Sequence, residues 1–236
     1  MKHLRIGAVV VCSLIATGLL LLFMKKPLLK IGVFDKDIIN FYVGYELSTV
    51  VVSLVFLLVI YLLADKLRLN FFNLKRIDGP VKPVALIGLK PKEGEGWKKI
   101  GLTIGSIITL ATAVVVYFQV AFGDGLSFRF FPEIPLVIIL ALMNSFTEEV
   151  IYRLSYTTIV ANEGGDPRVS EFLSAIVFGG VHYFGIAPNG IAGALMAGFI
   201  GWFLAKSINE TKGFFWAWMI HFAQDIVILF FLFMKN

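Results

Sequence analysis

Long apolar runs constrain this chain more than any other feature of its sequence. At about 1.5 Å of rise per helical residue, most of them can cross a hydrocarbon core of about 30 Å. The runs cover residues 6–24, 41–64, 100–122, 134–158, 172–187, 191–208 and 213–234. With 58% hydrophobic residues overall, the chain lies outside the range of ordinary soluble domains. We therefore predict an all-α fold, a polytopic transmembrane bundle of about seven helices with a buried polar site.

The charged residues between the runs indicate the orientation of the chain. The segment 65–99 carries nine Lys and Arg residues against four Asp and Glu residues. The positive-inside rule places such a segment, and with it the amino terminus, in the cytoplasm. The net charge of +5 follows from this orientation, so nucleic acid is not an expected partner. Cys12 is the single cysteine, which excludes an intramolecular disulfide.

The chain is expected to form one integrated membrane domain in two parts. Residues 1–133 supply amino-terminal helices and the basic loop, and residues 134–236 supply a core of helices with deep ionisable residues. In the run 191–208 and just before it, small residues repeat every four positions in two stripes, Gly190, Ala194 and Gly198 beside Gly193, Ala197 and Gly201. Such stripes let helices approach closely in lipid, so we expect this helix at the centre of the bundle.

Two adjacent carboxylates and an arginine interrupt the fourth run. A charge at the centre of a bilayer costs about 2.5 to 3.5 kcal/mol, so such groups usually serve a function. Glu149 and Arg153 are four residues apart on one helical face and can pair, whereas Glu148 is turned about 100° away and lacks a local partner. We interpret Glu148 as the working group and the pair as its support. Glu46, near the start of the second run, is expected at the level of the lipid headgroups.

Two further runs carry ionisable residues in apolar sequence. His182 lies in the fifth run, and His221 and Asp225 share a helical face in the seventh. Counted from the cytoplasmic ends of the expected helices, Glu148 and both histidines lie about 12 to 15 Å deep. A cluster of this kind marks a substrate path, a proton relay or a catalytic centre.

Two histidines with carboxylates support two kinds of amide hydrolysis. They suit Zn²⁺, with a fourth position open for a water whose pKa is lowered. Without metal, Glu148 could act as general base while the neighbouring groups stabilise the oxyanion. The sequence has no His-Glu-x-x-His or Gly-x-Ser-x-Gly pattern, so soluble metalloproteases and serine hydrolases have no local support.

At these residues the chain resembles the CPBP family of intramembrane proteases, which groups type II CAAX prenyl endopeptidases with bacteriocin-processing and bacteriocin-immunity (ABI-like) proteins. The similarity extends over residues 134–234. Three motifs carry it in order, Glu148-Glu149-x-x-x-Arg153, Phe178-x-x-x-His182 and His221-x-x-x-Asp225. Many relatives have Asn at the last position. An ionised Asp only accepts hydrogen bonds, which favours metal ligation or orientation of the histidine.

The resemblance implies a role for each motif residue. Glu148 would be the catalytic base, and His182 would hold the water or a metal. His221 and Asp225 would complete the metal site or the oxyanion hole, so Glu148, His182, His221 and Asp225 are both the catalytic candidates and the candidate ligands of Zn²⁺. Glu149 and Arg153 would brace the first motif. The site would be reached from the cytoplasmic side of a bacterial plasma membrane.

We therefore predict a metal-dependent intramembrane endopeptidase whose partners are the lipid bilayer and a membrane-associated protein or peptide substrate. One alternative is a bacteriocin-immunity or scaffold protein that acts by binding. A second is a proton-coupled transporter, which would show repeats and broken helices in both halves. The deep ionisable residues lie only in the second half, which disfavours that class.

Overall fold

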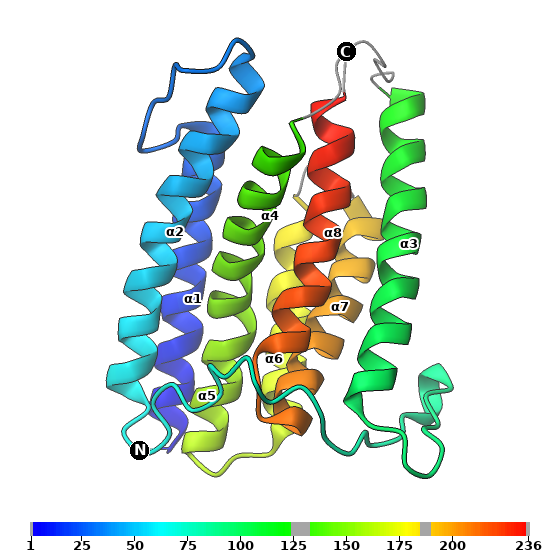
Figure 1. Cartoon of the computed structure of the whole chain (residues 1–236). Helices are drawn as coiled ribbons and strands as arrows, with labels where there is room; N and C mark the ends of the chain where they lie inside the picture. Colours follow the sequence, from blue (N-terminus) through cyan, green and yellow to red (C-terminus); the bar gives the residue numbers. More distant parts are fainter. Residues whose placement is uncertain (1, 124–132, 185–189, 235–236) are drawn as a thin grey trace.

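The computed structural model describes residues 2–123, 133–184 and 190–234, and in this part the chain is an all-α bundle (Figure 1). Its elements are α1 (Lys2–Lys25), α2 (Asp37–Leu63), the 3-10 turn η1 (Ala85–Ile87), α3 (Trp97–Gly123), α4 (Ile134–Glu149), the π-helical turn η2 (Val150–Leu154), α5 (Ser155–Asn162), α6 (Pro167–His182), α7 (Gly190–Thr211) and α8 (Phe215–Phe233). Because α4, η2 and α5 follow one another without a break, the described part contains seven helical rods. The predicted fold class is confirmed.

Six of these rods are long and apolar enough to cross a membrane, so the chain is an integral, multi-pass membrane protein. The fifth predicted run, 172–187, is the exception. Its helix α6 begins earlier, at Pro167, because Asp166 caps it and a proline suits the first helical position. It has only 16 residues to His182, and the predicted end at 187 lies outside the described residues.

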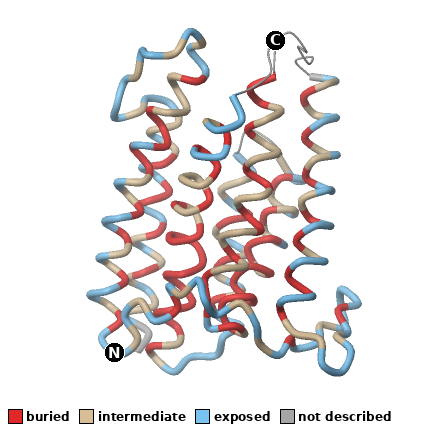
Figure 2. The backbone as a smooth tube through the Cα atoms, viewed as in Figure 1, coloured by how far each residue is buried: buried red, intermediate tan, exposed pale blue. Residues whose placement is uncertain are grey.

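The two-stripe helix α7 lies at the centre, as predicted. Its most apolar window is 56% buried, against 28 to 33% in α1, α2 and α3. Figure 2 shows buried positions concentrated where α4 to α7 meet, with exposed positions along α2 and α3. A Cβ atom on Gly179 of α6 would lie 2.7 Å from the backbone oxygen of Ala194, and one on Gly201 would lie 2.6 Å from that of Ser174. Glycine therefore permits the close contact of α6 with α7.

The basic segment lies across the end of the bundle that carries the amino terminus (Figure 1). Two tryptophan side chains attach the basic segment to the bundle. Trp216 Nε1 donates to the backbone oxygen of Ile77 over 2.7 Å, and Trp97 Nε1 donates to Glu210 Oε2 over 2.9 Å. The segment 26–36 joins α1 to α2 at the opposite end (Figure 1). The site described next lies between these two ends.

Candidate active site

A cavity of about 150 Å³ lies among the helices of the bundle. Its lining includes all four residues proposed as catalytic, Glu148 from α4, His182 from α6, and His221 and Asp225 from α8. The structure thus brings the ionisable groups of three helices to one cavity. Their depths along the helices differ from the prediction, because α5 continues to Asn162 and α6 begins at Pro167.

His221 is held by the second carboxylate of the acidic pair. Its Nδ1–H donates to Glu149 Oε1 over 2.7 Å, which directs Nε2 toward Glu148 Oε2 at 3.4 Å and Asp225 Oδ1 at 3.6 Å. The hydrogen bond to a carboxylate orients the ring, as it does in many catalytic histidines. The sequence did not predict this contact, because nothing in it shows which helical face meets α4.

The predicted pair of Glu149 and Arg153 is present. Arg153 Nη1 lies 3.1 Å from Glu149 Oε1, and both side chains are fully buried. The guanidinium carbon also lies 3.6 Å from the centre of the Phe178 ring, a cation–π contact. Glu149 therefore joins Arg153 to His221, and its carboxylate is shared between the two.

The π-helical turn η2 begins directly after Glu149 and contains Arg153. Such turns interrupt the regular hydrogen bonding of an α-helix and often occur at functional sites. Here the Ser174 hydroxyl of α6 donates to the backbone oxygen of Tyr152 over 2.7 Å, and the Tyr152 hydroxyl lies 2.8 Å from Thr17 Oγ1 of α1. The turn is thus held from both sides, and no sequence pattern in the run predicted it.

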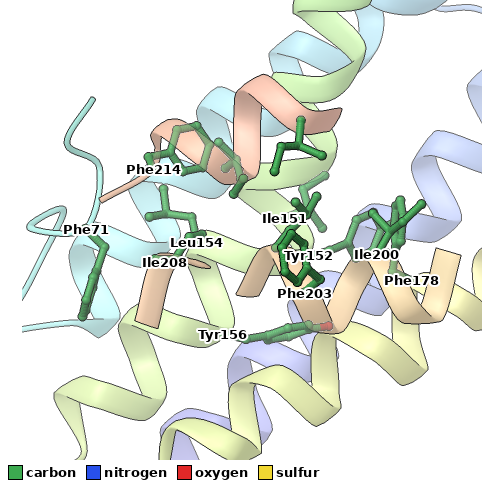
Figure 3. Close-up of a cluster of buried hydrophobic side chains, with 14 of the residues drawn as sticks. Phe71, Ile151, Tyr152, Leu154, Tyr156, Phe178, Ile200, Phe203, Ile208 and Phe214 are labelled. Carbon is green, nitrogen blue, oxygen red and sulfur yellow. The ribbon is translucent and has the colours of Figure 1, made fainter. Parts of the chain in front are cut away.

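The aromatic ring of Phe178 packs against the rings of both histidines. Its ring centre lies 4.2 Å from that of His182 and 5.6 Å from that of His221, and it packs beside Tyr152 in the buried cluster of Figure 3. His182 Nδ1–H donates to the backbone oxygen of Phe178 over 3.0 Å. This leaves Nε2 of His182 as the ring atom that can accept from a water or substrate.

Asp225 has a partner that the sequence analysis missed. Asn144 Nδ2 donates to Asp225 Oδ2 over 3.0 Å, and Asn144 also lines the cavity. It lies four residues before Glu148 and so on the same helical face, a spacing that could have identified it.

The headgroup position predicted for Glu46 is wrong. Its residue is 1% exposed, and it lines the cavity together with Glu148 and Asp225. The reason is that α2 begins at Asp37, four residues before the predicted run, which places Glu46 about 14 Å into the helix. Thr49 Oγ1 donates to Glu46 Oε2 over a long distance of 3.4 Å.

The described side chains do not form a ready ligand set for the predicted zinc. Among the residues that the structure describes, no group of three or more His, Cys, Asp and Glu side chains is placed to hold a metal ion. The distances of 3.4 and 3.6 Å from His221 Nε2 to two carboxylates are those of ion pairs and polar contacts. The described arrangement is therefore not a preformed zinc site.

The cavity extends away from the basic end of the bundle. Its lining includes Leu21 and Met24 near the end of α1, Tyr42 near the start of α2 and Leu232 near the end of α8. These helix ends lie at the opposite end from the amino terminus in Figure 1. The cytoplasmic access expected from the sequence finds no support in this lining.

Comparison with known proteins identifies one similarity. Residues 129–227 match the family model described as type II CAAX prenyl endopeptidase Rce1-like, and this segment contains all three motifs. No curated protein and no solved structure matches the chain.

Proposed function

Because residues 129–227 belong to the type II CAAX prenyl endopeptidase Rce1-like family, we propose that this protein is an intramembrane endopeptidase that hydrolyses a peptide bond of a membrane-associated protein or peptide. The observation that carries the proposal is the cavity shared by Glu148, His182, His221 and Asp225. Buried acid and imidazole groups around one space are what water-dependent amide hydrolysis requires.

In the proposed reaction Glu148 is the general base. It takes a proton from a water whose other hydrogen is accepted by His182 Nε2, and the water oxygen attacks the carbonyl carbon of the substrate. His221, whose Nδ1–H is held by Glu149, acts as an imidazolium and presents its Nε2–H to the developing oxyanion, and Asp225 orients that group. Glu148 then gives its proton to the leaving nitrogen as the carbon–nitrogen bond breaks. A general base contributes about 10² to 10⁴ in rate, and one oriented oxyanion donor about 10² to 10³.

The sequence also predicts that zinc assists the hydrolysis, and this prediction is separate from the reaction described above. No step above uses a metal, because the described side chains do not form a three-ligand site. Metal analysis of the purified protein beside His221→Ala tests it. About one equivalent of zinc in the wild type, lost in His221→Ala, is the result that the prediction requires, and equal contents in both proteins would contradict it.

The location and the side of access are further parts of the proposal. The motif resemblance supports the plasma membrane of a bacterium, which fractionation of the membranes would test. The course of the cavity toward the ends of α1 and α8 supports entry of the substrate from the end of the bundle opposite the basic segment.

The proposal is tested on the proteins of the membrane itself, so that no substrate has to be assumed. Membranes that contain wild type or Glu148→Gln are compared by mass spectrometry of new peptide termini. We expect termini that appear with wild type and are absent with Glu148→Gln. Glu93→Gln, which changes an exposed acid in the basic segment, is the matched control and should behave as wild type. Equal termini from wild type and Glu148→Gln at equal expression would contradict the endopeptidase and favour a protein that acts by binding.

A further inference from the structure

Glu46 is a buried acid for which the proposed reaction has no use. It belongs to α2, which lies outside the segment 129–227 that matches the family, and yet it lines the same cavity as Glu148. A carboxyl group with 1% exposure is costly to bury unless it is paired. Its position beside the reacting groups therefore requires a reason.

The lining around Glu46 is acidic and aromatic. Three carboxyl groups, those of Glu46, Glu148 and Asp225, face the cavity, and within the described lining no Lys or Arg side chain balances them. Arg153 is engaged elsewhere, between Glu149 and the Phe178 ring. Within the described lining of the cavity, the histidines are thus the only side chains that can carry a positive charge beside these acidic groups.

Two aromatic rings accompany Glu46 on its helix. Tyr42 lies four residues before it, on the same helical face, and Tyr45 is its neighbour, and both line the cavity. The Tyr45 ring is stacked on Phe41 with a distance of 6.3 Å between ring centres, and the Tyr42 ring packs against Phe233 at 5.5 Å. A carboxylate with aromatic rings beside it is the chemistry that recognises a cation, because the ring faces carry negative charge.

We infer that Glu46, Tyr42 and Tyr45 form a subsite for a cationic group of the substrate, a lysine or arginine side chain within a few residues of the scissile bond. The inference rests on the proposed endopeptidase function and adds a substrate preference to it. The subsite selects and positions the substrate, while Glu148 and the histidines carry out the chemistry. An acidic side chain in the same place would meet three carboxyl groups and be repelled.

The experiment compares cleavage sites in the membrane proteome for wild type, Glu46→Gln, Glu46→Asp and Glu46→Lys. For wild type we expect lysine and arginine to be enriched within three residues of the Glu148-dependent cuts. Glu46→Asp keeps the charge and should keep this enrichment. Glu46→Gln should lose it, and Glu46→Lys should replace it with enrichment of acidic residues.

A peptide taken from the most frequent site then measures the preference directly. Between a peptide with lysine and the same peptide with glutamine, wild type should differ by about tenfold or more in kcat/KM, which corresponds to one partly desolvated ion pair. With Glu46→Gln the kcat/KM values of the two peptides should agree within about twofold, because the charge that distinguishes them is gone. A purely structural role of Glu46 would instead slow both peptides by the same factor.

Each outcome has a distinct meaning. If Glu148-dependent cuts exist without enrichment of basic residues, or if Glu46→Gln leaves the enrichment unchanged, the subsite is refuted and the endopeptidase stands. If no cut depends on Glu148, the endopeptidase is refuted and the subsite with it.

Discussion

His221 donates its Nδ1–H to Glu149 Oε1 over 2.7 Å, so the two adjacent carboxylates of α4 serve different purposes. Glu149 is fully buried and fixes the imidazole, whereas Glu148, with 13% of its side chain exposed, faces Nε2 at 3.4 Å. The same change made at the two neighbours should therefore have different consequences.

Glu149→Gln should unfold more readily than Glu148→Gln. It leaves the Arg153 guanidinium buried without its carboxylate, and breaking a buried pair by removing one partner costs about 3 to 5 kcal/mol. Glu148→Gln changes a side chain that lines the cavity and is 13% exposed, and it should abolish cleavage with less than about 1 kcal/mol of destabilisation. Thermal unfolding in detergent micelles, measured beside the cleavage rate, checks both. Equal stability of the two variants would show that the pair of Glu149 and Arg153 does not hold the fold.

The contact of α6 with α7 should depend on one of two adjacent glycines. Gly179→Ala places a Cβ atom 2.7 Å from the backbone oxygen of Ala194, whereas a Cβ atom on Gly180 meets nothing within 4 Å. We expect Gly179→Ala to lower the unfolding temperature, and to reduce cleavage by shifting His182, which lies three residues further along α6. Gly180→Ala is the matched control and should be neutral or slightly stabilising, because alanine favours a helix over glycine. A loss of cleavage in both variants would point to helix α6 in general rather than to this contact.

Entry of water into the cavity can be measured by thiol labelling. In a Cys12→Ser background, Leu21→Cys would lie in the cavity lining. Leu22→Cys would lie on the outer side of α1, where Leu22 is 55% exposed. A membrane-impermeant maleimide needs a thiolate, which forms in water and not in hydrocarbon. We expect Leu21→Cys to react when the reagent is added on the side of the segment 26–36, and Leu22→Cys to remain unlabelled. Labelling of Leu21→Cys only from the side of the basic segment would restore the cytoplasmic access that the sequence predicts.

Several features of the fold and site could be predicted from the sequence because they depend on local spacing. Apolar runs predict helices, and an interval of four residues places Glu149 beside Arg153, as the structure confirms. The small residues of α7 likewise predicted a close contact with a neighbouring helix, which the glycines of α6 and α7 provide.

Other features depend on which helical faces meet, and the sequence does not contain this information in local form. The hydrogen bond between Glu149 and His221 joins residues 72 positions apart. Glu46 was assigned to the headgroups because the predicted apolar run begins at residue 41, whereas α2 begins at Asp37. Nothing in the sequence indicates the π-helical turn, because all five of its residues would also suit an ordinary buried helix.

The central claim is that groups from three helices act in one cavity on one water and on the carbonyl group that it attacks. Its most direct test is the cleavage rate of Glu148→Gln, His182→Ala and His221→Ala, alone and in pairs, on a peptide from an identified site. Residues that act as a unit are strongly non-additive, so we predict that each single change reduces kcat by about 10² or more and that the pairs are hardly slower than the slowest single variant. Rates that fall by the product of independent factors, or a Glu148→Gln variant that cleaves as fast as wild type, would contradict the account.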